Sequence, residues 1–75
     1  MLTDAAEQRA ARKELARLER QLERLAGREA DLQRRIVQQA ADPAAFRELD
    51  SELRVVLAAK SDLETRWLEV ADVAG

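Results

Sequence analysis

Apolar residues recur at alternating intervals of three and four residues in two arms of similar length, separated by Asp42-Pro43. This spacing keeps a narrow apolar seam along one side of a helix, and such a seam is buried by packing against a partner helix. In the first arm, with Glu29 interrupting, the seam positions are Ala11, Leu15, Leu18, Leu22, Leu25, Leu32 and Ile36. In the second arm, with Lys60 interrupting, they are Phe46, Leu49, Leu53, Val56, Leu63, Trp67, Val70 and Ala74. The sequence therefore predicts an all-α fold of two long helices.

The Asp42-Pro43 dipeptide predicts a reversal of the chain between the arms. Proline biases the residue before it away from helical geometry but suits the first position of a new helix, which makes Asp42 a natural N-cap. A connection this short makes the two helices antiparallel. We expect a single coiled-coil hairpin with a helix over residues 4–40, a turn at 41–43 and a helix over 43–73. A parallel dimer of continuous helices would share the same heptads, and Pro43 argues against it.

The turn position also predicts which residues face each other across the seam. The expected layers pair Leu22 with Leu63, Leu18 with Trp67, and Leu15 with Val70. In this register Glu29 and Lys60 fall in adjoining layers. A polar residue in a seam lowers stability but can specify register, and the alternative is that both side chains extend separately into water.

The residue content argues against an active site in this chain. There is no histidine and no cysteine, so the usual metal ligands, the usual neutral-pH base and the strongest nucleophile are missing. Ser51, Ser61 and Thr65 have no base nearby to activate them, and Gly27 and Gly75 cannot form a phosphate-binding loop alone. We expect a non-enzymatic chain without a cofactor. No apolar run approaches the roughly 20 residues that span a bilayer, and we expect a cytoplasmic protein without a signal segment or membrane contact.

Charge is distributed unevenly between the arms. From Asp4 to Ala41 there are nine Lys and Arg against seven Asp and Glu, whereas from Asp42 onward there are four against eight. Cations recur every three or four residues along the first arm, which places them in a line on one side of a helix. This basic stripe consists of Arg9, Lys13, Arg17, Arg20, Arg24 and Arg28. From Lys13 to Arg28 it spans roughly 22 Å at 1.5 Å per residue, enough for several phosphates.

Two functions remain open on these grounds. The stripe predicts electrostatic, sequence-independent binding of nucleic acid, since Phe46 and Trp67 are assigned to the seam and no aromatic residue is left for base stacking. Glu19 and Glu23 are interspersed with the cations, so part of the stripe is expected to be paired locally. The alternative is a protein-binding or self-associating coiled-coil scaffold, in which the apolar run over residues 55–59 would seat a further helix or a second hairpin.

Three segments carry a resemblance to a known family. They are the string Arg12-Lys13-Glu14-Leu15-Ala16-Arg17-Leu18-Glu19-Arg20, the turn Asp42-Pro43-Ala44-Ala45-Phe46 and the closing Leu63-Glu64-Thr65-Arg66-Trp67-Leu68-Glu69. Together they resemble the C-terminal coiled-coil domain of ABC-F proteins, soluble ATP-binding cassette ATPases without membrane domains, and in particular the Uup-like branch. The resemblance runs from about Arg9 to Asp72, and the Asp-Pro turn and Trp67 are its most specific parts.

The resemblance implies a role as an accessory domain. In this family two tandem ATPase domains precede the hairpin, members act on ribosomes or, in the Uup-like branch, are linked to DNA, and the hairpin contacts nucleic acid. ATP and magnesium would belong to the parent ATPase, because neither the phosphate loop nor the signature sequence is present in this chain. Family members often begin the hairpin with a lysine-rich, aromatic-bearing segment, and Met1 to Gln8 do not resemble it.

Overall fold

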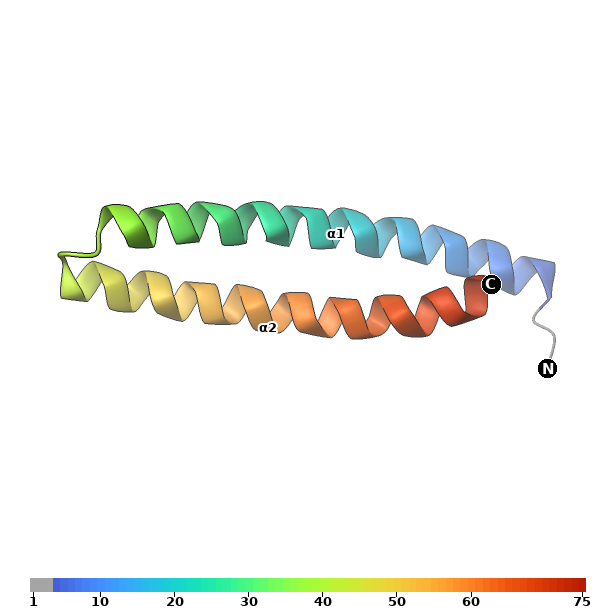
Figure 1. Ribbon diagram of the computed structural model, residues 1–75. Helices are drawn as coiled ribbons and strands as arrows, with labels where there is room; N and C mark the ends of the chain where they lie inside the picture. Colours follow the sequence, from blue (N-terminus) through green and yellow to red (C-terminus); the bar gives the residue numbers. More distant parts are fainter. Residues whose placement is uncertain (1–3) are drawn as a thin grey trace.

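The chain folds into an antiparallel helical hairpin. The computed structural model describes residues 4–75, in which helix α1 (Ala5–Gln38) and helix α2 (Pro43–Ala74) lie side by side, with the start of α1 extending past the end of α2 (Figure 1). The hairpin measures 56 × 16 × 11 Å. This confirms the all-α, two-helix fold predicted from the heptad pattern.

Aspartate side chains cap both helices at their N-termini. Asp4 Oδ1 accepts a hydrogen bond from the Glu7 backbone N–H at 2.8 Å, and Asp42 Oδ1 accepts from Ala44 and Ala45 at 3.1 and 3.2 Å. Pro43 occupies the first turn of α2, where its missing N–H costs no helical bond. The expected cap at Asp42 is therefore confirmed.

The helix boundaries differ slightly from the expected ranges of 4–40 and 43–73. Asp4 is the N-cap, so α1 begins one residue later, and α1 ends at Gln38 because the chain must turn before Pro43. Residues 39–41 form the turn, which the Asp42 N–H closes by donating to the Gln39 carbonyl at 3.0 Å. At the other end α2 continues one residue further, to Ala74.

Burial along the seam is uneven. Heptad position a holds residues such as Leu15 and Leu22, and position d holds residues such as Leu18 and Leu25. Every buried residue in the described chain is a d residue, and the set is Ala11, Leu18, Leu32, Leu49, Val56 and Val70. No a residue is buried in residues 4–75. Because the a positions of both helices line the same face of an antiparallel pair, the apolar side chains on one face of the hairpin stay partly exposed, and this is called the open a face below.

The buried residues form two clusters that agree with the predicted register. The cluster near the chain ends joins Leu15 and Leu18 of α1 to Leu63, Trp67 and Val70 of α2. The cluster near the turn is built from Leu25, Leu32 and Ile36 of α1 with Leu49, Leu53 and Val56 of α2. The two helices thus pack in the alignment that the turn position predicts.

Phe46 corrects one assignment to the seam. Its side chain remains 41% exposed and belongs to neither cluster. In this register its layer partner would be residue 39, but α1 has already ended and Gln39 starts the turn. Phe46 therefore lacks a layer partner on α1 and remains partly exposed.

Candidate nucleic-acid interface

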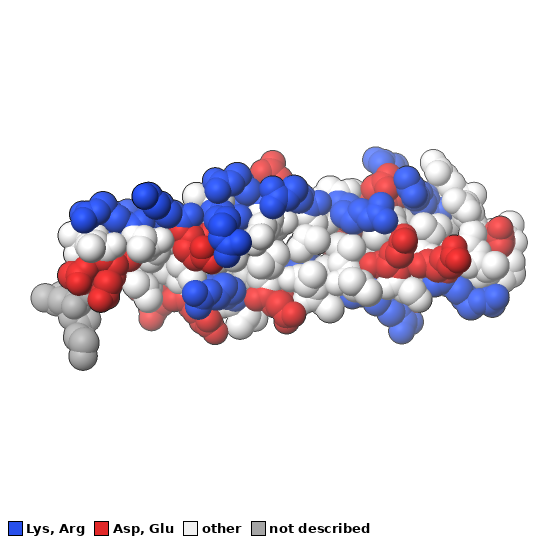
Figure 2. All heavy atoms as spheres, turned by 180° about the vertical axis from the view of Figure 1, so that it is seen from behind, with Lys and Arg blue, Asp and Glu red and all other residues white. Residues whose placement is uncertain are grey.

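The basic stripe lies on the outer side of α1. Figure 2 shows Lys and Arg side chains following the edge of the molecule formed by α1 over most of its length, with carboxylates gathered chiefly below them. Four members of the stripe are exposed and form no ion pair with any residue of 4–75, and they are Arg9, Lys13, Arg20 and Arg24. These four cations are available to an anionic partner.

Arg17 is held by a neighbour on its own helix. Its Nε donates to Glu14 Oε2 at 2.9 Å and its Nη2 to Glu14 Oε1 at 2.6 Å, which is a bidentate pair over one helical turn. Hydrogen bonding to Arg17 lowers the pKa of Glu14, and the same bond raises the pKa of Arg17. An anion that engages Arg17 must compete with this carboxylate.

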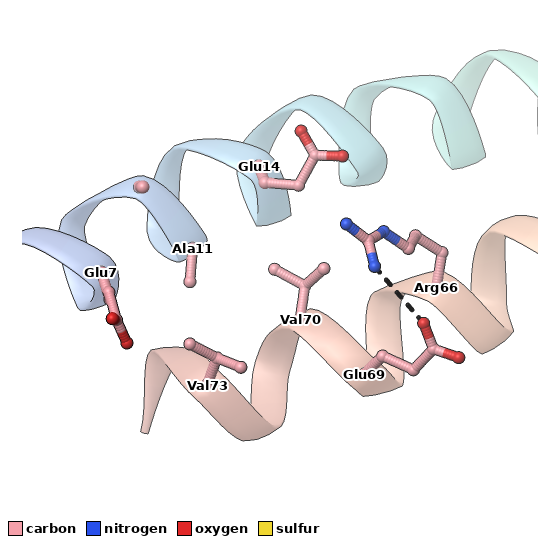
Figure 3. A pocket seen from close by; sticks show the side chains of 8 residues that line it. Glu7, Ala11, Glu14, Arg66, Glu69, Val70 and Val73 are labelled. Atoms are coloured by element: carbon pink, nitrogen blue, oxygen red, sulfur yellow. Dashed lines mark hydrogen bonds and ion pairs between the residues drawn. The ribbon is translucent and has the colours of Figure 1, made fainter. Parts of the chain in front are cut away.

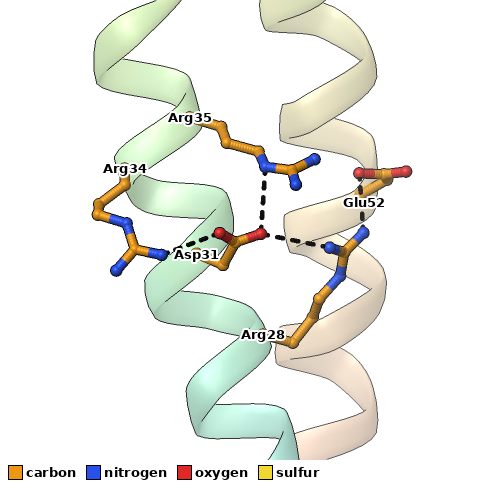
Figure 4. Close-up of polar contacts among 5 residues, drawn as sticks. All are labelled: Arg28, Asp31, Arg34, Arg35 and Glu52. Atoms are coloured by element: carbon orange, nitrogen blue, oxygen red, sulfur yellow. Dashed lines mark hydrogen bonds and ion pairs between the residues drawn. The ribbon is translucent and has the colours of Figure 1, made fainter.

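Arg28 belongs to a small network at the turn-proximal half of α1. The guanidinium bridges Asp31 of its own helix at 3.5 Å and Glu52 of α2 at 3.3 Å (Figure 4). Asp31 also accepts ion pairs from Arg34 at 2.9 Å and Arg35 at 3.2 Å. Three arginines therefore share one carboxylate, so this end of α1 carries excess positive charge even though its cations have partners.

The sequence suggested that Glu19 and Glu23 pair with cations of the basic stripe, and the structure does not show this pairing. Neither carboxylate forms an ion pair within residues 4–75, and Glu19 Oε1 instead accepts a hydrogen bond from the indole N–H of Trp67 at 3.2 Å. Local pairing of the stripe is supplied by Glu14 and Asp31, which lie three residues from Arg17 and Arg28. This leaves Arg20 and Arg24 free.

One exposed and unpaired cation of α1 lies outside the predicted basic stripe. Arg12 forms no ion pair with the described residues, although it adjoins Lys13 in the sequence. Neighbouring residues on a helix point about 100° apart at 3.6 residues per turn, so Arg12 falls outside the line that defined the stripe. A count of all unpaired cations, rather than those at helical spacing, would have included it.

A shallow groove of about 440 Å³ opens between the helices near the chain ends (Figure 3). Arg66 crosses it and pairs with Glu69 at 3.4 Å, while Glu7 and Glu14 lie on the opposite helix. The lowered pKa of Glu14 keeps this carboxylate ionised near neutral pH, whereas a general acid needs a raised pKa. The groove is thus a charged surface feature, and Glu14 is not suited to act as a proton donor in it.

The described part of the chain lacks two features that would indicate a function. Within residues 4–75 no helix is long and apolar enough to cross a membrane, and no group of three or more His, Cys, Asp or Glu side chains could hold a metal ion. No protein-family model, no curated protein and no solved structure matches the chain. Its function must therefore be inferred from the residues and their geometry.

Proposed function

We propose that this hairpin is a non-catalytic accessory domain that contacts nucleic acid or the ribosome through the outer side of α1. The observation that carries the proposal is the line of exposed cations at Arg9, Lys13, Arg20 and Arg24, which have no carboxylate partner among residues 4–75. Cations left unpaired beside 15 acidic residues in the same chain mark a surface suited to an external anion.

The geometry suits a phosphate backbone. From Arg9 to Arg24 the free cations extend over roughly 22 Å at 1.5 Å per residue. Each phosphate that they neutralise releases condensed counterions, so affinity should fall as salt rises. Arginine also matches phosphate with two parallel N–H donors.

Binding by this surface would be independent of sequence. Trp67 packs into the seam cluster near the chain ends, and Phe46 lies at the turn, away from the free cations. Base stacking therefore has no aromatic platform along the stripe. Phosphate contacts position a protein on nucleic acid without reading its bases.

The resemblance to the ABC-F C-terminal coiled coil supports the same function. It suggests a cytoplasmic parent protein in which separate ATP-binding cassette domains use ATP and magnesium, while the hairpin reaches the nucleic acid. Under this proposal the hairpin contributes affinity and position, and the parent's ATPase domains contribute the energy.

The proposal can be tested by fluorescence anisotropy. Labelled duplex DNA, single-stranded DNA and structured RNA are titrated with the hairpin at two salt concentrations. We expect salt-sensitive binding that weakens in the double variant Arg20→Glu/Arg24→Glu, with the salt slope reduced by about one for each cation lost.

The matched control reverses two exposed arginines of α2, in the variant Arg47→Glu/Arg54→Glu. It changes the net charge by the same amount but leaves the stripe intact, and circular dichroism checks that both variants stay helical. Equal losses in the two variants would indicate an effect of net charge alone. Absence of binding to all three polymers would reject the proposal and favour a protein-contacting role.

A further inference from the structure

The open a face of the hairpin carries an apolar groove with an acidic rim. Leu22 of α1 and Trp67, Leu68 and Glu64 of α2 line a depression of about 300 Å³. Leu68 is 65% exposed, although it is one of the large apolar residues of this lining. An exposed leucine next to a half-buried leucine and a half-buried tryptophan suits a contact surface.

Carboxylates border this Trp67 groove on both helices. Glu19 and Glu23 lie three residues before and one residue after Leu22, and Glu64 lies on the facing helix. None of the three forms an ion pair within residues 4–75, and Glu19 uses one oxygen to hold the Trp67 indole N–H at 3.2 Å. The rim is therefore negatively charged and uncompensated.

We propose that the Trp67 groove binds an amphipathic helix of a partner protein whose apolar face is flanked by lysine or arginine. Such a helix places apolar residues at i, i+3, i+4 and i+7 in the groove and its cations against the rim. This inference goes beyond the proposed function, because it concerns a different set of residues and a basic rather than an anionic partner.

A second copy of the hairpin fits the groove less well than a basic helix. Two copies packed groove to groove would bring together two sets of the same three carboxylates, Glu19, Glu23 and Glu64. Like charges facing each other across an interface oppose association. The run over residues 55–59 does not form one continuous apolar surface, because Val55 and Leu57, both exposed, point about 100° to either side of the buried Val56.

The test uses the fluorescence of Trp67, which is the single tryptophan of the chain. The hairpin is titrated with an 18-residue Leu/Lys peptide designed as an amphipathic helix. The comparison peptides are a Leu/Lys peptide of the same composition with a scrambled order and a Leu/Glu peptide of the same pattern. We expect a saturable blue shift with the amphipathic Leu/Lys peptide alone.

Two pairs of variants locate the binding surface. Leu68→Ser should weaken binding about tenfold, because it removes an apolar contact, while Val55→Ser removes an equally exposed apolar residue outside the groove and should change nothing. Glu23→Gln/Glu64→Gln should weaken binding about fivefold, whereas Glu48→Gln/Asp72→Asn, which removes two unpaired carboxylates elsewhere, should leave it unchanged.

Equal binding of the scrambled peptide, or equal affinity of Leu68→Ser and wild type, would overturn the proposal. Sedimentation velocity of the hairpin alone is a second test. A concentration-dependent dimer that Leu68→Ser abolishes would assign the groove to a second copy and would also overturn it. The titrations contain no nucleic acid, so their outcome is independent of the test of the basic stripe.

Discussion

Lys60 Nζ lies 3.0 Å from Glu29 Oε1, and this ion pair crosses the seam from α2 to α1. Both residues occupy a positions, and the other a positions between Leu15 and Ile36 and between Phe46 and Ala74 hold apolar side chains. Their side chains are only 32% and 20% exposed, so the two charges meet each other instead of extending separately into water. Any slip of one helix along the other would separate the pair and leave two partly buried charges unmatched, which favours the observed register.

Replacing both members of this pair with leucine should stabilise the hairpin. An apolar layer avoids the desolvation of two charges, and we expect the free energy of unfolding to rise by about 1 kcal/mol in Glu29→Leu/Lys60→Leu. The single variant Lys60→Leu leaves Glu29 partly buried without its cation and should be less stable than the double variant. Urea denaturation followed by circular dichroism measures all three, and a double variant less stable than wild type would contradict this account.

Trp67 should be the most costly side chain to truncate near the chain ends. It packs against Leu18 and Val70 and also donates its indole N–H to Glu19. Because Trp67 is only partly buried, Trp67→Ala should lower the free energy of unfolding by about 3 kcal/mol, the lower end for core aromatic residues. Trp67→Phe retains most of the packing and loses the hydrogen bond, so its cost should be about 1 kcal/mol. Equal losses of unfolding free energy in Trp67→Ala and Trp67→Phe, or a negligible loss in Trp67→Ala, would mean that Trp67 does not pack in the seam.

Gly27 weakens an exposed turn in the middle of α1. A Cβ built at this position meets no atom within 4 Å, so alanine fits without displacing a neighbour. Gly27→Ala should raise the free energy of unfolding by about 1 kcal/mol, because glycine loses more backbone freedom in a helix. Ala30→Gly, on the same helix and also exposed, should lower it by a similar amount. Thermal unfolding of both variants checks the expected opposite signs.

Glu14 and Arg17 predict a dependence of stability on pH. Hydrogen bonding to Arg17 makes the folded-state pKa of Glu14 lower than its unfolded value. The stability that this pair contributes to the folded state is therefore fully present above the unfolded pKa, which is about 4.3 for glutamate. It is lost as the pH falls through the lower folded pKa. Carboxyl NMR titration should show the Glu14 pKa rising in Arg17→Gln but not in the control Arg47→Gln. A Glu14 pKa that is unchanged in Arg17→Gln would exclude Arg17 as the cause.

The fold could be predicted from the sequence because its determinants are local. The three-four spacing of apolar residues places them on one side of each helix whatever the chain packs against, and Asp42-Pro43 specifies the reversal within a few residues. The register followed from the position of this turn, and Phe46 was misassigned because the end of α1 at Gln38 depends on how the turn closes.

The candidate sites depended more strongly on tertiary structure. Helical spacing correctly put the cations in a line on α1, but it could not tell that Arg17 is held by Glu14 while Arg20 and Arg24 remain free. Side chains of this length reach several neighbours, and only the packed structure selects among them. The ligand proposed for the free cations is a prediction from their charge and exposure.

The sequence by itself determined that two amphipathic helices would pair in one antiparallel alignment, because periodicity and turn chemistry act over a few residues. Only the tertiary structure decided that the fully buried residues are all d residues and that the a face stays open around Trp67 and Leu68. That choice rests on contacts between residues far apart in the chain, such as Arg28 with Glu52 and Glu19 with Trp67. Such contacts form only when the two helices pack, and no spacing rule within one helix contains that information.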